Sequence, residues 1–570
     1  MDKKTTILGI DAKTILAIVL TAMVIVGVPM LFPSAPPKRP AMTDSTTSRA
    51  TDSLSRDAAG APGATPATPA AVGSTVRSAT DSTPVAAAAA PVDTARITTP
   101  FSTYRFTSQG ATIASVQATG YTALRTLDKG RPVELVPDRE MLVRYRLTNG
   151  RDTVALASVP FAATHEANPA SPGVSYQAQT ALGAFTLHYT VKPDSANSYL
   201  VHVDTRLEGA TAGTQLLVDL PRRIRSEEAD SVDDTRHLAY AYKPLHDDAQ
   251  SVAFTKLDSL KTRVDSGPFR WVAVRNKYFL LAVIGDRDSS FTLLRMRGTP
   301  KRAGLVHEAI ATTVLPLRDG AASFDLYAGP QQFQRLIALG RGLDNVNPYS
   351  SFMRPVVQPV ATIVMRLLLW MKHATGLSYG WVLIIFGILI RIAMWPLQQS
   401  AMRSSMKMQT LQPELQEVQK KYKDDPDKQR EAMMKLYAAH GMSPFSPVVG
   451  CLPMLLPMPI LFALYYVFGN TIEFRGVPFL WLADLSLRDP FYIAPVLTGL
   501  TMFLASWIGL RNAPPNPQAK MMAYMMPAML TALFLNFASG LNLYYAVQNI
   551  ASLPQQWLLA EERKKKQVVK

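Results

Sequence analysis

Six apolar segments stand out along the chain, near residues 14–32, 380–398, 449–469, 491–510, 521–537 and 541–560. Because a helix rises about 1.5 Å per residue, roughly 20 apolar residues cross a hydrocarbon core of about 30 Å. The uncharged stretch from Met521 to Ala560 is 40 residues long, about twice what one span needs. It must therefore fold back, and Ala538-Ser539-Gly540 is the natural turn. The pattern predicts six transmembrane helices.

A second pattern, of short β-type runs separated by Gly, Pro, Asp and Asn, occupies residues 95–345. In the run at 199–207, apolar Val201 and Val203 alternate with polar residues, which is the period of a half-buried strand. The region is long enough to form one large β-sandwich, and we expect a closing helix around residues 332–343.

Residues 33–94 consist mainly of Ala, Pro, Ser and Thr and cannot form a core. We expect a disordered linker here, behind an N-terminal transmembrane anchor at residues 1–32. A cleaved signal peptide is the alternative for the anchor. Its apolar region would be shorter, however, and Ser34-Ala35-Pro36-Pro37 is a poor cleavage site, so we favour an uncleaved span.

Residues 350–373 are apolar, but Pro359 and Arg366 interrupt them, so they are too broken to span a membrane. Their large apolar residues recur at helical spacing: Val357, Val360, Val364, Leu367, Leu368 and Met371. This spacing favours an amphipathic helix that lies on the outer membrane surface. A core helix of a soluble domain is the alternative.

Residues 374–566 hold the remaining five spans and a polar insertion, and a basic tail follows at 567–570. Within the insertion, apolar residues recur at a three-four spacing from Met408 to Tyr422, and Asp424-Asp425-Pro426 then breaks the helix. We therefore predict a helical hairpin at residues 403–441. Two solvated helices packed on each other would give this pattern, and so would a mobile docking element.

The distribution of basic residues indicates membrane topology rather than nucleic-acid binding. The net charge is +16, but Lys and Arg lie beside apolar spans instead of in a stripe interleaved with stacking aromatic residues. Residues 399–448, 511–520 and 561–570 hold fifteen Lys and Arg residues, whereas 470–490 holds two. By the positive-inside rule, both termini are cytoplasmic. The predicted fold class is a polytopic α-helical membrane protein with six transmembrane helices and a large extracytoplasmic all-β sandwich domain.

The sequence contains no pattern that predicts catalysis or a bound cofactor. The single cysteine, Cys451, lies in an apolar span, and the histidines lack the spacing of metal ligands. There is no P-loop, and Gly376-Leu377-Ser378-Tyr379-Gly380 matches a nucleophile elbow by letters alone, because no strand precedes it. We expect no catalytic residue, no metal and no cofactor, and therefore a protein that is not an enzyme.

Arg391 is the single charge inside the span at 380–398. An arginine at the centre of a membrane helix costs roughly 2.5–3.5 kcal/mol or more, so it normally faces a wet cavity and has a partner. The other apolar segments of the C-terminal part contain no Asp or Glu. We interpret Arg391 as a cation kept for water, a lipid headgroup or an acidic group on a visiting molecule. An arginine that snorkels to the inner boundary near Pro396 is the alternative.

Polar residues of the last span form a stripe in which Asn542, Tyr545 and Asn549 stand at i, i+3 and i+7. The candidate residues of a hydrophilic groove are Arg391, Gln398, Gln399, Asn542, Tyr545 and Asn549. Hydrogen bonding between helices is the alternative use of this stripe. Eighteen of the 24 methionines lie from Met353 onward. Flexible thioether surfaces suit varied apolar partners, although gap filling in a core is again the alternative.

The chain from about Tyr349 to Lys566 resembles the YidC/Oxa/Alb family of membrane protein insertases, in its Gram-negative form. The motifs that carry the resemblance are IRIAMWPL at the end of the arginine span, LQPELQ at the start of the hairpin, GCLPMLLPMPILFALYY in the third span, PFLWLADLSLRDPFYI before the fourth and SGLNLYY in the last. The first span and the β domain match by arrangement more than by residue. For the β domain the resemblance implies a β-supersandwich, similar to sugar mutarotases but without known catalysis.

The resemblance also implies roles for particular residues. Arg391 corresponds to the groove arginine that receives the polar part of an incoming chain, while the third and fifth spans form the apolar surface along which its apolar segment leaves. Met454 and Met458 belong to the third span, and Met525 and Met529 belong to the fifth. The implied partners are nascent membrane proteins, the phospholipid membrane, the ribosome and the Sec translocon, with no nucleic acid read directly.

The expected function is thus insertion and folding of newly made proteins in the bacterial inner membrane, with a periplasmic β domain. The expected route is an arginine-containing groove open to cytoplasm and lipid, without nucleotide hydrolysis. Two other classes stay open. A solute transporter would have a cationic site sealed from lipid, with broken helices or internal repeats. A structural scaffold for assembling membrane complexes would have no use for an unpaired Arg391.

Overall fold

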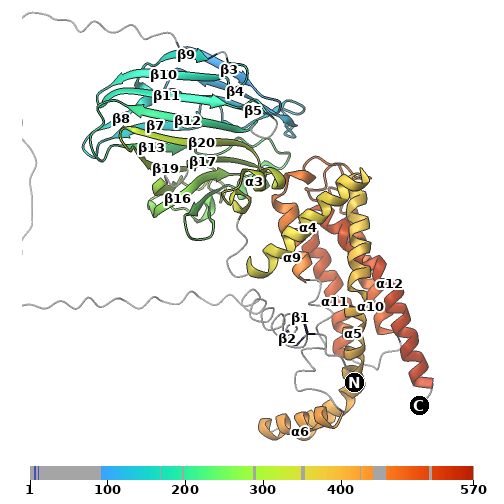
Figure 1. Cartoon of the computed structure of the whole chain (residues 1–570). Helices are drawn as coiled ribbons and strands as arrows, with labels where there is room; N and C mark the ends of the chain where they lie inside the picture. Colours follow the sequence, from blue (N-terminus) through green and yellow to red (C-terminus); the bar gives the residue numbers. More distant parts are fainter. Residues whose placement is uncertain are drawn as a thin grey trace, which may run out of the picture. The chain divides into compact units, whose positions relative to one another are not determined.

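The computed structural model describes residues 6–7, 10–11, 92–166, 168–194, 198–286, 291–347, 354–423, 425–440, 458–511 and 517–568 (Figure 1). The chain divides into two units, Met1–Ala89 and Ala90–Lys570. In the first unit, β1 (Thr6–Ile7) and β2 (Ile10–Asp11) pair in antiparallel fashion. The predicted anchor near 14–32 and nearly all of the predicted linker at 33–94 lie outside the described residues.

Two antiparallel sheets form the β domain, one of 14 strands and one of four within the described ranges. The smaller sheet contains β3 (Thr94–Thr98), β4 (Ser102–Thr107), β5 (Thr112–Thr122) and β6 (Pro132–Glu134). The larger sheet contains β7 (Arg144–Thr148), β8 (Thr153–Ala155), β9 (Ala162–Glu166), β10 (Gly173–Thr180), β11 (Gly183–Val191), β12 (Leu200–Leu207), β13 (Gln215–Leu220), β14 (Ala239–Pro244), β15 (Gln250–Ala253), β16 (Arg263–Arg275), β17 (Phe279–Gly285), β18 (Phe291–Gly298), β19 (Ala309–Pro316) and β20 (Ala321–Pro330). Its strand order is β8-β7-β13-β19-β18-β16-β17-β20-β12-β11-β10-β9, with β14 joined to β16 and β15 to β14.

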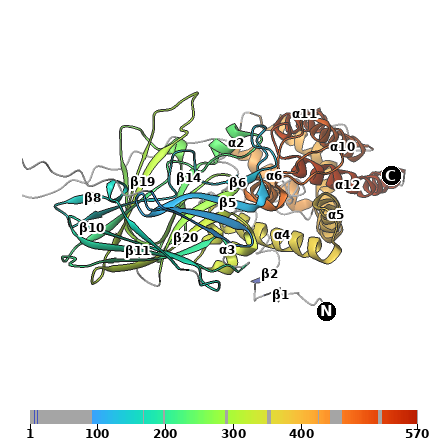
Figure 2. The same cartoon turned by 90° about the horizontal axis from the view of Figure 1, so that it is seen from above.

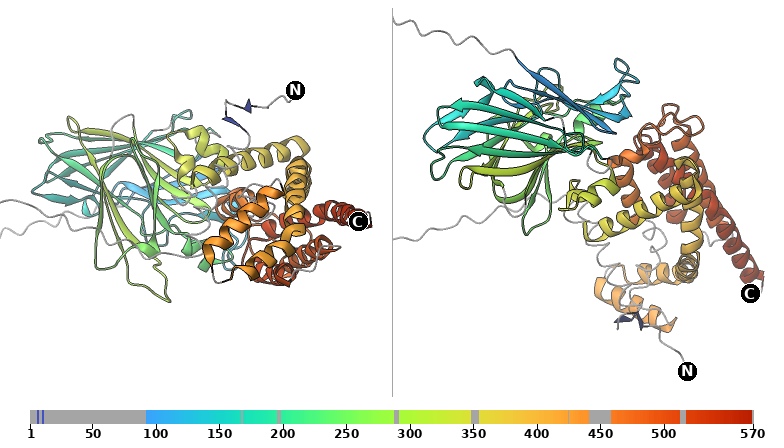
Figure 3. Two further views of the ribbon diagram at one scale, coloured as in Figure 1. Left: turned by 90° about the horizontal axis from the view of Figure 1, so that it is seen from below. Right: turned by 45° about the horizontal axis from the view of Figure 1, so that its top comes forward.

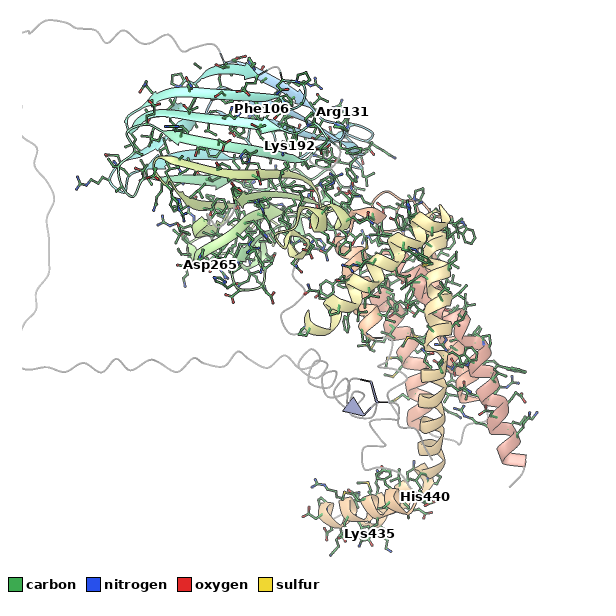
Figure 4. The ribbon with its side chains drawn as sticks, in the orientation of Figure 1. Phe106, Arg131, Lys192, Asp265, Lys435 and His440 are labelled. Atoms are coloured by element: carbon green, nitrogen blue, oxygen red, sulfur yellow. The ribbon has the colours of Figure 1, made fainter. Side chains whose placement is uncertain are left out.

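Alternating side chains hold the sandwich together. On β12, Val201 and Val203 are buried while His202 and Asp204 are half-buried, as the period of two requires. Phe106 of the smaller sheet (Figure 4) packs on Tyr189 of the larger sheet, with ring centroids 5.2 Å apart. Both sheets therefore contribute to one core, and the predicted all-β sandwich is confirmed.

The expected closing helix at 332–343 is shorter in the structure. Helix α3 (Phe333–Leu339) ends at Gly340, and the short 3-10 helix η3 (Leu343–Asn345) follows. Gly340 and Gly342 have φ values of +69° and +74°, a left-handed conformation that a continuing right-handed helix does not contain. Three further short helices lie in the β domain: η1 (Leu156–Ser158), α2 (Ser231–Arg236) and η2 (Phe254–Lys256).

The remaining elements are helical. They are α4 (Arg354–Thr375), α5 (Tyr379–Lys421), α6 (Pro426–Ala439), α9 (Met458–Asn470), the 3-10 helix η4 (Ile472–Phe474), α10 (Ile493–Leu510), α11 (Pro517–Phe534) and α12 (Ser539–Val568). Helix α10 packs against α11 and α12, α5 against α12, and α4 against α9. Figures 1 and 2 show α10, α11 and α12 side by side. In Figure 3, α12 is the dark red helix that carries the C-terminal end.

Of the helices in the described ranges, two are long and apolar enough to cross a membrane, at Tyr379–Pro396 and Ile493–Leu510. The helices at Met458–Asn470 and Ala523–Phe534 are apolar but shorter. The chain does turn back where the uncharged stretch predicts it, because α11 ends at Phe534 and α12 begins at Ser539. Two of the six predicted spans therefore meet the length criterion, and the count of six stays a prediction.

The predicted interfacial segment is an uninterrupted helix, α4, with Pro359 inside it. Val357, Val364, Leu368 and Met371 are buried on one face, and α4 packs against α9. The spacing in the sequence thus identified the buried face. This packing agrees with a core role for that face, and the membrane surface position of α4 stays a prediction.

The arginine span and the first arm of the predicted hairpin form one continuous helix. Helix α5 runs for 43 residues, with Pro396 and Pro413 inside it, whereas the sequence suggested a span that ends at 398. Helix α6 begins after the Asp-Pro break, where the Asp425 side chain accepts a hydrogen bond from the Lys428 N–H, as an N-cap does.

A small cluster of Leu411, Leu415 and Tyr437 joins the ends of α5 and α6. At the end of α6, His440 (Figure 4) lies with its Nε2 3.7 Å from Glu414 Oε2. Few of the hairpin side chains that the structure describes are buried, so we expect its opening to need little free energy.

The loop between α9 and α10 packs into the β domain. Arg475 Nε donates to both carboxylate oxygens of Glu228, at 2.8 and 2.9 Å, and Arg475 Nη1 donates to the Thr122 carbonyl at 2.9 Å. Tyr278 Oη donates to Ser486 Oγ at 2.8 Å. The Arg475 and Glu228 side chains are only 3% and 4% exposed, so this ion pair is fully desolvated.

Glu473, in the same loop, makes the stability of the fold depend on pH. Its Oε1 accepts from the Phe333 N–H at 3.1 Å, whereas its buried Oε2 has no hydrogen-bond partner among the described residues. Burial raises the pKa of Glu473 to about 7. A carboxyl whose pKa rises on folding favours the native state when protonated, so stability falls as pH increases from about 4.5 to about 7.

We expect Glu473→Gln to stabilise the protein at pH 8, by up to about 3 kcal/mol, and to have no effect at pH 4.5. Thermal unfolding of the purified full chain in detergent at both pH values measures this difference. The exposed Glu431→Gln, on α6, is the matched control. Equal thermal shifts at pH 4.5 and pH 8 for Glu473→Gln would show that the effect is packing and not charge.

Candidate functional site

A partly open cavity of about 250 Å³ lies within the helical part. Its walls come from α5, α10 and α12, with one residue from α9. The lining residues are Ile390, Arg391, Met394, Gln398, Ile460, Met502, Ala505, Ser506, Gly509, Tyr544, Tyr545, Gln548, Asn549, Ser552 and Gln556. Both polar and apolar residues line it, and Arg391 is the only charged residue in this lining set.

Close helix packing positions this cavity. Gln548 Nε2 on α12 donates to the Gly387 carbonyl on α5 at 2.7 Å. A Cβ at Gly387 would lie 3.1 Å from Val547 Cγ1, so glycine lets the two helices approach. On the other side, Thr498 Oγ1 of α10 donates to the Asn542 carbonyl of α12 at 2.9 Å. Small and polar residues at such contacts are typical of helix association in membranes.

Arg391 is 8% exposed and has a neutral partner. Its Nη2 donates to Gln555 Oε1 at 2.6 Å, while its buried Nε has no partner among the described residues. The expectation of an unpaired Arg391 was wrong, because it considered only acidic partners and the partner is an amide on α12. A carboxamide satisfies one guanidinium donor but leaves the positive charge uncompensated.

The structure brings several of the predicted groove residues together. Gln398, Tyr545 and Asn549 line the same cavity as Arg391. Gln399 does not line the cavity but is linked to Arg391 through Gln555: its Oε1 accepts from Gln555 Nε2 at 3.3 Å. Two residues of the polar stripe on α12, Tyr545 and Asn549, thus face the same cavity as Arg391 and Gln398 of α5.

Asn542 does not line the cavity. Its side chain is fully buried, and its Nδ2 donates to the Phe534 carbonyl at the end of α11, at 3.1 Å. This bond satisfies a carbonyl that has no partner within its own helix. This bond supports the alternative, hydrogen bonding between helices, and a groove role for Asn542 stays a prediction.

Three of the four predicted methionines lie in the described residues, and none of these three lines the Arg391 cavity. Met525 and Met529 are each 59% exposed on α11, and neither lines the cavity. Met458 is half-buried at the first turn of α9 and is likewise absent from the lining. Met454 lies outside the described residues. An exposed methionine pair still fits an apolar surface for lipid or substrate, but it is separate from the Arg391 cavity.

Several lining residues were missed in the sequence, although the signal was present. The stripe of Tyr545 and Asn549 continues at helical spacing to Ser552 and Gln556, and both line the cavity. Gln555 stands next to them and reaches α5. On α10, Ser506 gave no such signal, because a single serine in an apolar helix is ordinary.

The groups that line this site can bind a polar or charged ligand. Among the residues that the structure describes, no group of three or more His, Cys, Asp or Glu side chains could hold a metal ion. The lining serines have no histidine or carboxylate beside them in the lining set to act as a base. Arg391 Nε and Gln398 Oε1 are buried and have no hydrogen-bond partner among the described residues. The positive charge of Arg391 suits an anionic ligand.

Comparison with known proteins identifies relatives for most of the chain. Residues 94–363 match the family described as "YidC periplasmic domain", and residues 370–567 match the family described as "60Kd inner membrane protein". A protein of Pelodictyon phaeoclathratiforme named "Membrane protein insertase YidC" is 33% identical over 415 residues, which are 66% of this chain and 68% of the relative. A protein of the same name from Chlorobaculum tepidum is 33% identical over 389 residues, 64% of this chain and 63% of the relative.

The chain thus spans just under two thirds of the length of the first curated relatives it matches. Among solved structures, "Active YidC insertase crystal structure with the first transmembrane domain resolved" is similar at 19% identity and a TM-score of 0.33, covering 81% of this chain and 92% of that one. The structure of YidC from Thermotoga maritima is similar at 14% identity and a TM-score of 0.28, covering 82% and 99%.

Proposed function

Because the chain belongs to the YidC family of membrane protein insertases, we propose that it inserts newly made proteins into the bacterial inner membrane. In this proposal the Arg391 cavity receives the hydrophilic segment that must cross. The observation that carries the proposal is the buried Arg391, whose recorded side-chain partner within the described part of the chain is the neutral Gln555. An arginine buried in a membrane span without a counter-ion raises the free energy of the folded protein, so such a residue is taken first as part of a functional site.

The free energies fit a protein that lowers a barrier without fuel. A substrate helix with fifteen Leu, Ile, Phe or Val residues gains roughly 5–9 kcal/mol on insertion, whereas one acidic residue in the translocated segment faces a barrier of about 3 kcal/mol or more. The overall reaction is downhill, so a polar cavity partway through the membrane is sufficient. Nucleotide hydrolysis has no part in this mechanism.

The topology proposed for this function has six spans, both termini in the cytoplasm and the β domain in the periplasm. The hairpin of α5 and α6 then faces the cytoplasm, where a ribosome or the Sec translocon would deliver the substrate. The exposed apolar residues of α11, among them Met525 and Met529, face lipid or the departing substrate helix. The proposed cavity opens to both cytoplasm and lipid.

A solute transporter is the competing function, and the helix that carries Arg391 distinguishes it from an insertase. A transporter needs a site sealed from lipid and a second, inverted half that alternates access. The present helices show Arg391 on one long unbroken helix, α5, rather than on the discontinuous helices that hold transporter substrates. This observation favours the insertase. A structural scaffold is disfavoured by the cost of burying Arg391.

The function can be tested with the purified full chain in liposomes and a single-span substrate diluted from denaturant, without nucleotide. We expect protease protection of the substrate's translocated tail to rise at least several-fold above protein-free liposomes. Uptake of a panel of small anionic solutes, measured in the same vesicles, tests the transporter. Insertion no better than in empty liposomes, or insertion only with ATP, would reject the proposal.

A further inference from the structure

We propose that Gln555 is a positioning residue that keeps Arg391 available to acidic substrate segments, a role that rests on the function proposed above. It does so by holding the guanidinium with a neutral acceptor at the one place where a carboxylate would cancel the charge.

The geometry fixes which end of the Gln555 carboxamide faces Arg391. Gln555 is fully buried, and its Nε2 donates to α5 at two acceptors, Gln399 Oε1 at 3.3 Å and the Trp395 carbonyl at 3.5 Å. With both donors directed to α5, the amide oxygen is left for Arg391 Nη2, at 2.6 Å. The side chain thus has one orientation that satisfies all three neighbours.

A neutral acceptor has a different consequence from an acidic one. A glutamate here would form a desolvated ion pair, and the cavity would have no net charge to offer. With glutamine, one donor of Arg391 is satisfied and its orientation is set, while the full positive charge remains. Within the described lining of the cavity, no Asp or Glu side chain takes the place of that carboxylate.

The positive charge of Arg391 is the feature of this site that a ligand would meet. Arg391 Nε and Gln398 Oε1 have no hydrogen-bond partner among the described residues, but both atoms are fully buried and offer no exposed binding point. The charge of Arg391, oriented by its hydrogen bond to Gln555, is therefore what would attract an acidic segment.

The test compares three variants on one single-span substrate whose tail carries zero, one or two Asp residues, or two Lys residues. Gln555→Glu changes one amide to a carboxylate at nearly constant size. Gln555→Met removes the hydrogen bonds at similar volume and adds no charge. Gln556→Glu places the same new charge in the same cavity on a residue with no hydrogen bond to Arg391, and is the matched control.

We expect Gln555→Glu to slow insertion of the two-Asp tail about tenfold, to leave the neutral tail nearly unchanged and to speed the two-Lys tail. Gln555→Met should slow all tails alike and keep the order of preference among them. Gln556→Glu should shift that order much less. A gain for the Lys tail cannot come from a folding defect, so this arm separates charge from structure.

Two outcomes would overturn the proposal. If Gln555→Glu and Gln555→Met slow every tail equally, Gln555 only joins α5 to α12. If Gln556→Glu matches Gln555→Glu, the cavity senses total charge and Gln555 has no special place. The wild-type protein, measured in parallel against empty liposomes, tests the insertase function itself: if it shows no insertion above empty liposomes, that function fails before Gln555 is considered.

Discussion

Replacing Arg391 by alanine is expected to slow insertion of a substrate with two acidic residues in its tail by about a hundredfold, and to leave a neutral tail nearly unaffected. Two charges about 4 Å apart interact by about 4 kcal/mol at the dielectric of a partly buried site. A hundredfold change in rate corresponds to about 2.7 kcal/mol in the barrier, which is less than this interaction free energy. The tail crosses the membrane as part of the reaction, so the interaction acts on the barrier.

The measurement uses the substrate series with zero, one and two acidic residues in vesicles that contain wild-type, Arg391→Ala or Arg391→Lys protein. Arg391→Lys should retain much of the wild-type rate, because a point charge at that depth is needed more than a two-pronged donor. Equal slowing at every tail charge would mean that Arg391 hydrates the cavity or anchors α5 without recognising the substrate. The electrostatic mechanism would then be abandoned.

Arg475→Met should open the loop between α9 and α10. The change leaves Glu228, which is buried, without its partner, and breaking one side of a buried ion pair costs about 3–5 kcal/mol. Local opening would become easier by the same amount. Backbone amides of residues 471–492 should therefore exchange hydrogen at least about a hundredfold faster than in wild type at pH 8. The exposed Arg488→Met, in the same loop, should change exchange little.

The effect should depend on pH with a defined sign. Burial raises the pKa of Glu228 to about 7, although Arg475 opposes the rise. Without Arg475 the pKa of Glu228 increases further, and the native state then binds its proton more tightly than the unfolded state does. Stability lost in the Arg475→Met variant should be greatest above pH 7 and should recover toward pH 5, where Glu228 is neutral. The Glu228→Gln/Arg475→Met double variant should remove this pH dependence.

Local patterns predicted the elements of this protein better than its long-range contacts. The break before Pro426, the turn at 538–540 and the buried face of α4 all follow from residues within a few positions of one another. Tyr545 and Asn549 were placed at the site by helical spacing alone. These signals belong to single helices, in which side chains four apart share a face.

Other features depend on residues that are far apart in the sequence. Arg475 and Glu228 are separated by 247 positions, and no periodicity connects a membrane loop to a β-domain carboxylate. Gln555 was overlooked as the partner of Arg391 because a search for opposite charge passes over amides. Asn542 and Asn549 belong to the same polar stripe of α12. Asn542 donates to the carbonyl at the end of α11, whereas Asn549 lines the cavity. That difference is set by where α11 ends.

The continuity of α5 gives the molecule a mechanical connection. At about 1.5 Å per residue, the 43-residue helix is about 65 Å long, and it joins the hairpin to the turn that carries Arg391. Pro396 lacks the N–H that would bind the Ile392 carbonyl, so one backbone hydrogen bond is missing between the turn that carries Arg391 and the hairpin. This makes Pro396 a point of low resistance to bending within α5.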